Sequence, residues 1–385
     1  MKMSGVSEDV NRTKAHYEVL DGLRGVAALL VVVFHVFEGF AISSGSSVIG
    51  GLNHGYLAVD FFFLLSGYVL AYAYDDRWSR GLTLRRFFLR RLIRLQPMMV
   101  MGAFVGLLVI FCQGCEMRSG EAMELPMVAL AFVCALLMVP AWPRAGFELR
   151  GAGEMYPLNG PAWTLLFEYA GNVLYALVLR RLCSWVLGLL TLLLGAGLAW
   201  FAVADVSGYG FISVGWRADA PNLLGGSLRL LFPFCLGMWV CRCVAPGRVR
   251  GAFWICSAVL LVLFAVPFLP SWRGIHVNGV YEWVCIAVVF PVLVWLGASA
   301  CGLGRGSMGV CRWLGRLSYP LYAVHYPLMY VFFQWLVDER VTGLSEGWPV
   351  ALLVVLCSVL LAWLCLRFYD EPLRRWLGCR LLRRS

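Results

Sequence analysis

The chain has 385 residues, of which 61% are hydrophobic and 14% are charged, and its formal net charge at pH 7 is +10. Soluble globular domains are nearer half apolar and a quarter charged, so this composition excludes an ordinary water-soluble protein. The excess positive charge comes from arginines at the ends of long apolar runs, which indicates contact with membrane lipids and no nucleic-acid partner.

Apolar runs long enough to span a bilayer, or nearly so, recur along the whole chain. They fall at about 22–42, 56–74, 97–112, 126–140, 161–179, 184–203, 224–241, 252–269, 281–299, 317–337 and 347–367. This pattern predicts an all-α polytopic membrane protein with a single domain over 1–385. The polar tail 1–18 has no apolar core, so we expect no cleavable signal peptide.

Arginine-rich stretches flank these runs, and such stretches mark the cytoplasmic side. Placing both termini and all basic stretches in the cytoplasm, including the basic tail 368–385, leaves one segment too many between Arg94 and Arg180. We therefore expect about ten membrane-spanning helices and one re-entrant segment, either 97–112 or 126–140, because both are short and bounded by proline.

The first apolar run contains an ionisable pair. In L-D-G-L-R-G-V-A-A and the residues that follow, Arg24 and His35 stand 11 positions apart. On a helix this puts them on one face, about 16 Å apart along the axis. Asp21 lies one turn before Arg24, and Glu38 follows His35 by three residues. A histidine inside a membrane usually marks a functional site, although it can also simply bond a neighbouring helix.

This segment resembles the first span of the membrane-bound acyltransferases of family three, and the resemblance extends over most of the chain. It implies transfer of an acetyl or other short acyl group from acyl-coenzyme A to a hydroxyl of a saccharide or glycolipid, commonly of a bacterial surface polysaccharide. It also implies a multi-pass protein of the bacterial inner membrane, with acyl-CoA as co-substrate, no permanently bound cofactor and no metal. We expect the form without an added soluble domain.

The second run, A-V-D-F-F-F-L-L-S-G-Y, is similar to the second-span motif of that family. Ser66 and Gly67 permit close contact between helices. Asp60 is expected to hold either a base or an arginine, or to be a buried partner for another helix. His54, which precedes the run, is expected in a solvated outer loop.

The segment between Arg77 and Pro97 predicts a basic amphipathic helix at the inner membrane surface. Arg90 and Arg94 recur on one face, with Arg91 beside them. Attraction to anionic lipid is one explanation. The family resemblance implies another, in which Arg91 and Arg94 bind the phosphates of coenzyme A and Arg90 assists, since the guanidinium group binds phosphate bidentately.

The fifth run opens with N-G-P-A-W-T-L-L-F-E-Y, which resembles a family pattern of tryptophan, serine and glutamate. Trp163 and Thr164 are expected to be structural or to lie on the acceptor side, with Thr164 where serine is commoner. Glu168 lies about one turn further on. A carboxylate in an apolar run needs a partner, and Arg24, Arg91 and His35 are all candidates.

Two later segments also resemble the family. In L-S-Y-P-L-Y-A-V-H-Y-P-L, His325 either lines the site or is structural, and Tyr322 is a hydroxyl on the same helix. In Y-D-E-P-L-R-R-W, Glu371 and Arg374 are expected to form a surface clamp. Cys112 and Cys115 form a lone C-x-x-C, which does not complete a zinc site.

These residues lead to a hypothesis of O-acyl transfer in which His35 is the general base, Glu168, Asp60 or Glu38 orients it, and His325 supports it. Imidazole accepts protons at neutral pH, which suits this role. A covalent acyl intermediate is an alternative route. An alternative function is a transporter or flippase for a glycolipid or anionic solute, since intramembrane charges also suit transport.

Overall fold

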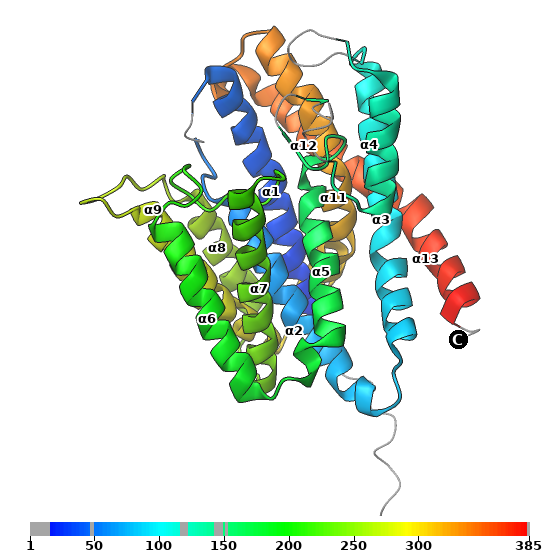
Figure 1. The fold of residues 1–385 in the computed structure, drawn as a ribbon, viewed down its shortest axis with the longest axis vertical. Helices are drawn as coiled ribbons and strands as arrows, with labels where there is room; N and C mark the ends of the chain where they lie inside the picture. The colour runs from blue at the N-terminus through cyan, green and yellow to red at the C-terminus, as the bar shows by residue number, and fades with distance from the viewer. Residues whose placement is uncertain (1–15, 47–49, 116–121, 142–148, 151–152, 383–385) are drawn as a thin grey trace, which may run out of the picture.

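The computed structural model describes residues 16–46, 50–115, 122–141, 149–150 and 153–382, and Figure 1 shows that its long helices form one bundle. The helices are α1 (Glu18–Ser44), α2 (Ala58–Ser79), α3 (Leu84–Cys112), α4 (Leu125–Leu137), α5 (Trp163–Leu177), α6 (Ser184–Val203), α7 (Ala220–Cys243), α8 (Ala252–Ala265), α9 (Val277–Val284), α10 (Phe290–Ala298), α11 (Arg305–Asp338), α12 (Leu344–Cys365) and α13 (Glu371–Leu377). In the described ranges, 8 helical stretches are long and apolar enough to cross a membrane. The chain is therefore an all-α polytopic membrane protein, as the sequence predicts.

The segment that follows α3 identifies the re-entrant candidate. α3 has 29 residues, enough for a full span, whereas α4 has only 13. The Met123 amide donates to the Cys115 carbonyl beside the end of α3, so α4 begins at that level. It ends beside Gln96, whose amide donates to the Leu136 carbonyl, about 24 Å back along α3. Arg150 contacts Gln113 at the original end, so the chain lies at the same level of α3 before α4 and again at Arg150, as a re-entrant segment requires.

Helices α1 and α11 pack side by side, and glycines permit their approach. A Cβ atom on Gly25 would lie 2.5 Å from the Leu314 carbonyl oxygen, and one on Gly22 would lie 2.8 Å from the Cys311 sulfur. Because Gly22 faces Cys311 and Gly25 faces Leu314, the two helices run parallel. The L-D-G-L-R-G motif thus supplies the small residues at this interface.

The predicted cytoplasmic stretches gather at one end of the bundle, where α2 ends and α3 begins, in the lower part of Figure 1. Arg242 of α7 bonds Asp75 of α2 at 2.8 Å, and Arg180 lies 4.0 Å above the Trp78 ring. At the same end, Arg312 of α11 pairs with Glu18 of α1. The first residues of α1 and the residues after α12 therefore lie at the same end.

Helices α2 and α7 contact each other backbone to backbone. A Cβ atom on Gly67 would lie 2.0 Å from the Phe234 carbonyl oxygen, and one on Gly237 would lie 2.1 Å from the Leu64 carbonyl oxygen. The expectation that Gly67 permits close contact is confirmed. Nearby, the guanidinium of Arg229 on α7 donates to both oxygens of Asp60, at 3.0 and 2.6 Å, and both side chains are buried.

Candidate active site

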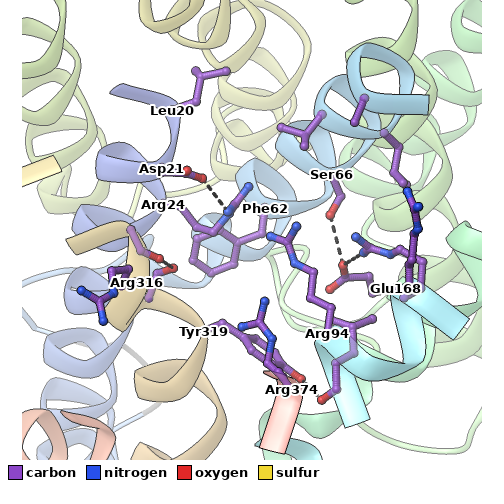
Figure 2. Close-up of a pocket in the computed structure, with 18 of the residues that line it drawn as sticks. Leu20, Asp21, Arg24, Phe62, Ser66, Arg94, Glu168, Arg316, Tyr319 and Arg374 are labelled. Carbon is purple, nitrogen blue, oxygen red and sulfur yellow. Dashed lines mark hydrogen bonds and ion pairs between the residues drawn. The ribbon is translucent and has the colours of Figure 1, made fainter. Parts of the chain in front are cut away.

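A cavity of about 1050 Å³ lies at the basic end of the bundle. Arginines from α1, α2, α3, α11 and α13 line it: Arg24, Arg77, Arg90, Arg91, Arg94, Arg312, Arg316, Arg374 and Arg375. Four carboxylates, those of Glu18, Asp21, Glu168 and Glu371, also line it. Figure 2 shows the side chains of Arg24, Arg94, Arg316 and Arg374 around this space. The excess of guanidinium groups makes the cavity a site for a polyanion.

The three predicted phosphate-binding arginines, Arg90, Arg91 and Arg94, all line this cavity. The prediction of a separate surface helix for them is wrong, because they belong to the first half of α3, which continues through Pro97 to Cys112. The Thr83 hydroxyl caps the helix by accepting from the Arg86 amide. The basic first half of α3 packs at the cavity wall, so the helix continues past Pro97. The arginines of this half that line the cavity therefore belong to the bundle and not to a separate surface helix.

The partner of Glu168 is Arg91. Its guanidinium Nη2 lies 2.6 Å from Glu168 Oε1, and the Ser66 hydroxyl donates to the same oxygen at 3.3 Å. These contacts join α3, α5 and α2, and Figure 2 shows the contact of Ser66 with Glu168 at the cavity wall. Glu168 therefore positions a cavity arginine and does not touch His35.

The other cavity arginines differ in how they are neutralised. Arg24 bonds Asp21 at 2.9 Å, on the same helix. Within the described part of the chain, Arg90 and Arg94 have no ion-pair or hydrogen-bond partner. These two guanidinium groups are available to a ligand.

The inner end of the cavity is formed by hydroxyl and aromatic side chains. The Thr164 hydroxyl lies 2.8 Å from the Tyr322 hydroxyl, and the Phe62 ring meets the Tyr322 ring edge-on at 5.7 Å. Trp163, by contrast, faces Arg229, whose guanidinium lies 5.5 Å from its ring. Trp163 is therefore buried beside the α2–α7 ion pair and is not part of the cavity lining.

His35 and His325 lie beyond this inner end. The rings of His325 and Tyr322 are 5.9 Å apart, and the ring of His35 stacks on that of His325 at 5.4 Å. His325 is fully buried, and its Nδ1 lies 3.0 Å from both the Leu321 and the Tyr322 carbonyl. Carbonyls only accept, so Nδ1 carries the proton, and Nε2, which has no hydrogen-bond partner among the residues that the structure describes, is left as an acceptor.

Glu38 is the carboxylate that orients His35. Its Oε2 lies 2.6 Å from Nδ1 of His35, and the His35 side chain is 13% exposed. Of the three orienting candidates, Glu168 is paired to Arg91 and Asp60 to Arg229. Asp60 contacts an arginine of another helix, which was one of its predicted partners. It does not contact His35.

A second polar cluster, at the other end of the bundle, has no counterpart among the sequence predictions. The Tyr330 hydroxyl donates to Glu154 at 2.5 Å, and the Arg150 guanidinium lies 3.7 Å above the Tyr330 ring. The Tyr326 ring bridges this cluster to His35, at 4.8 Å from each of the His35 and Tyr330 rings. Burial raises the pKa of the Glu154 carboxyl to about 7. In the sequence, this cluster is marked only by the charged residues Arg150 and Glu154 in the loop before α5.

The model of a family described as an acyltransferase domain matches residues 17–367. The chain belongs to the acyltransferase-3 family. The match covers the cavity arginines up to α11, the inner hydroxyls and His35. It ends before α13.

Several relatives of the acyltransferase-3 chain are known by name. A Rhizobium radiobacter protein described as protein 2 in the picA locus is 36% identical over 165 residues, which are 41% of this chain and 80% of that protein. The peptidoglycan O-acetyltransferase OatA of Listeria monocytogenes is 25% identical over 92% of this chain. The chain spans 55% of the length of that enzyme.

The acyltransferase MdmB of Streptomyces mycarofaciens is 25% identical to this acyltransferase-3 chain, over 94% of the chain and 92% of MdmB. No solved structure matches the chain significantly.

Two further sequence predictions concern residues that do not line the cavity. The prediction of a solvated His54 is wrong: the side chain is fully buried, 3.5 Å from Glu282, because the loop before α2 folds into the bundle. Cys112 and Cys115 are free thiols. In the described ranges, no three His, Cys, Asp or Glu side chains lie close enough to hold a metal ion.

The expected surface clamp at Glu371 and Arg374 lies beside a basic stretch. Glu371 accepts a hydrogen bond from Arg316 in the first half of α11, and Arg374 bonds Asp370 at 3.0 Å. Arg374 and Asp370 are four residues apart and share one helical face. Glu371 and Arg374 both line the acyltransferase cavity.

Proposed function

We propose that this chain is an O-acyltransferase that moves an acetyl or other short acyl group from acyl-CoA to a hydroxyl of a saccharide. One observation carries the proposal. The arginine-lined cavity ends at Thr164 and Tyr322. The ring of His325 lies next to that end, and the His35–Glu38 pair lies on the other side of His325.

The cavity suits coenzyme A in charge and in size. Coenzyme A carries a pyrophosphate and a ribose phosphate, and guanidinium groups bind phosphate through two parallel hydrogen bonds. Arg90 and Arg94 are the unpaired donors for this contact, with Arg91 held beside them by Glu168. The volume of about 1050 Å³ is at the upper end of the range for small-molecule sites, as a large ligand requires. The pantetheine arm then points to the inner end.

His35 supplies the base. With Nδ1–H donated to Glu38, the Nε2 lone pair of His35 takes the proton of the acceptor hydroxyl. The acceptor oxygen forms a bond to the thioester carbonyl carbon, the carbon–sulfur bond breaks, and the coenzyme A sulfur receives the proton from His35. The products are an ester and free coenzyme A. Positioned base catalysis contributes about 10²–10⁴-fold.

The acceptor reaches His35 from the other end of the bundle in this proposal. Glu154, Tyr330 and Arg150 lie there and present hydrogen-bonding groups to a sugar. The relative named as a peptidoglycan O-acetyltransferase supports a glycan acceptor. We place the arginine cavity on the cytoplasmic side of a bacterial inner membrane, where acyl-CoA is found, in agreement with the basic flanks.

Thiol release from acetyl-CoA by the purified protein, with a de-O-acetylated glycan as acceptor, tests the proposal. We expect turnover by the wild type, a loss of at least 100-fold for His35→Ala, and a raised KM for acetyl-CoA in Arg91→Ala/Arg94→Ala. Arg273→Ala is the matched control, since Arg273 is exposed, stacks on the Trp272 ring at 4.8 Å and does not line the cavity.

Full turnover by His35→Ala would remove His35 from the mechanism. Absence of thioester consumption with any acceptor would favour transport. Trapping a labelled acyl group on the protein, followed by peptide mass analysis, separates direct transfer from a covalent intermediate.

A further inference from the structure

The C-terminal helical segment forms part of the cavity mouth. Helix α12, the π-helical turn η6 (Leu366–Asp370), α13 and the π-helical turn η7 (Gly378–Leu382) follow one another without a break, over 39 residues. That is about 58 Å of helix, against about 30 Å of hydrocarbon. The excess extends past the membrane, where α13 and η7 pack against α3. Arg374, Arg375, Gly378 and Leu382 line the cavity.

The cavity arginines divide into two groups by exposure. The side chains of Arg91 and Arg24 are 7% and 18% exposed. Those of Arg374 and Arg375 on α13 and of Arg316 on α11 are 40%, 76% and 61% exposed. The first group lies toward the inner end and the second at the mouth, while Arg94 of α3 is itself exposed and also lines the cavity. The arginines of α1 and α3 and those of α13 thus offer positions for more than one anionic group along one cavity.

Of the mouth arginines, Arg316 and Arg375 are held loosely, whereas Arg374 pairs with the buried carboxylate of Asp370 at 3.0 Å. Arg375 lies 3.5 Å from Glu371, which also accepts from Arg316, so two guanidinium groups share one carboxylate. Exposed ion pairs of this kind contribute only about 0–1 kcal/mol. A phosphate can therefore take up the unused N–H donors of these arginines without displacing a strong internal contact.

We propose that Arg374 and Arg375 bind the phosphate on the ribose of coenzyme A, while Arg90, Arg91 and Arg94 bind its pyrophosphate. The inference rests on the proposed function. Coenzyme A is linear in its order of groups: thioester, pantetheine, pyrophosphate, then the phosphorylated ribose. If the thioester reaches the inner end at Thr164 and Tyr322, the ribose phosphate is the group left at the mouth. The C-terminal segment thereby makes the enzyme specific for coenzyme A over carriers that lack this phosphate.

Calorimetric binding of coenzyme A and of 3′-dephospho-coenzyme A to the full-length protein tests this inference separately from turnover. For the wild type we expect coenzyme A to bind about 10- to 100-fold more tightly than its dephospho form, because charge-assisted hydrogen bonds to one phosphate contribute a binding free energy of that size. In Arg374→Ala/Arg375→Ala we expect the ratio to fall to about one, with the affinity for the dephospho form unchanged. Arg374→Lys/Arg375→Lys should restore part of the ratio.

Arg380→Ala is the matched control. Arg380 belongs to the same C-terminal segment, stacks on Trp376 at 4.7 Å and does not line the cavity. It should keep the wild-type ratio. An unchanged ratio in Arg374→Ala/Arg375→Ala, or an equal loss in Arg380→Ala, would overturn the inference.

Two further outcomes are distinguishable. If the binding ratio behaves as expected but no acceptor supports thiol release, the binding assignment stands and the acyl-transfer proposal fails. If the binding ratio of the double variant is unchanged and its only defect is a lost response to phosphatidylglycerol in phosphatidylcholine nanodiscs, the mouth arginines bind a lipid headgroup and the inference is wrong.

Discussion

Nδ1 of His35 lies 2.6 Å from Oε2 of Glu38, one helical turn further along α1. This contact orients the ring and leaves Nε2 for the proposed proton transfer, while the rings of His325 and Tyr326 on α11 pack against it. A carboxylate also stabilises the imidazolium that forms when the base takes a proton, as in other histidine–carboxylate pairs.

Glu38→Gln should lower kcat by about 10-fold, less than His35→Ala, because the amide oxygen still orients the ring but no longer carries charge. The KM for acyl-CoA should not change, since Glu38 does not line the donor cavity. Steady-state thiol release measures both parameters. Glu346→Gln, at an exposed carboxylate, is the control. A kcat equal to that of the wild type would show that Glu38 has no catalytic effect.

Arg91→Ala and Glu168→Ala should each destabilise the protein, and the double variant should lose less stability than the sum of the two single losses. Each change leaves the other member of a mostly buried pair without its partner. We expect a coupling free energy of about 0.5–3 kcal/mol from a double-mutant cycle on thermal unfolding in detergent. Additive losses would mean that the 2.6 Å contact contributes no coupling.

Asp60→Asn should destabilise the fold by about 3–5 kcal/mol, because it leaves Arg229 buried without its counter-charge. Activity per folded molecule should be retained, since Asp60 contacts neither the cavity nor His35. Unfolding in detergent and active-site-normalised turnover are the two measurements. Asp219→Asn removes an exposed pair with Arg217 and should change stability by less than about 1 kcal/mol. Equal effects of the two substitutions would contradict this interpretation.

The stability of the wild type should fall as pH rises from about 5 to 8, through the pKa of Glu154 at about 7. Burial raises this pKa above its ordinary value of 4.5, so folding takes up a proton between these two values. Stability is therefore full below the lower value and is lost as the folded carboxyl ionises. Glu154→Gln cannot ionise and should have a flatter profile of melting temperature against pH. Identical profiles for the two proteins would exclude this carboxyl as the cause.

The fold was predictable because hydropathy and arginine placement are local signals. Each predicted apolar run contains a helix, and the proline-bounded run 126–140 holds the short helix α4, which ends beside the middle of α3. The basic helix before Pro97 was not assigned correctly. A proline and a change from charged to apolar residues suggest that a helix ends there, whereas tertiary packing continues α3 through Pro97 as one helix.

Within the site, residues one helical turn apart were easier to connect than residues on different helices. His35 and Glu38 share α1, so their spacing alone placed them together. The contacts of Glu168 with Arg91 and of Asp60 with Arg229 join helices far apart in the sequence, and no spacing rule selects them. The Glu154–Tyr330 contact was missed for the same reason.

The backbone contact between α2 and α7, at Gly67 and Gly237, has a mechanical consequence. Any side chain there would have to displace a carbonyl, and the Asp60–Arg229 pair locks the same two helices. This wall of the cavity is stiff. The opposite wall ends in the short helix α13, whose ion pairs join exposed arginines to Asp370 and Glu371 one turn before them. We therefore expect any room that a bulky ligand needs to come from this side, and a crosslink between the C-terminal segment and α3 should slow ligand entry.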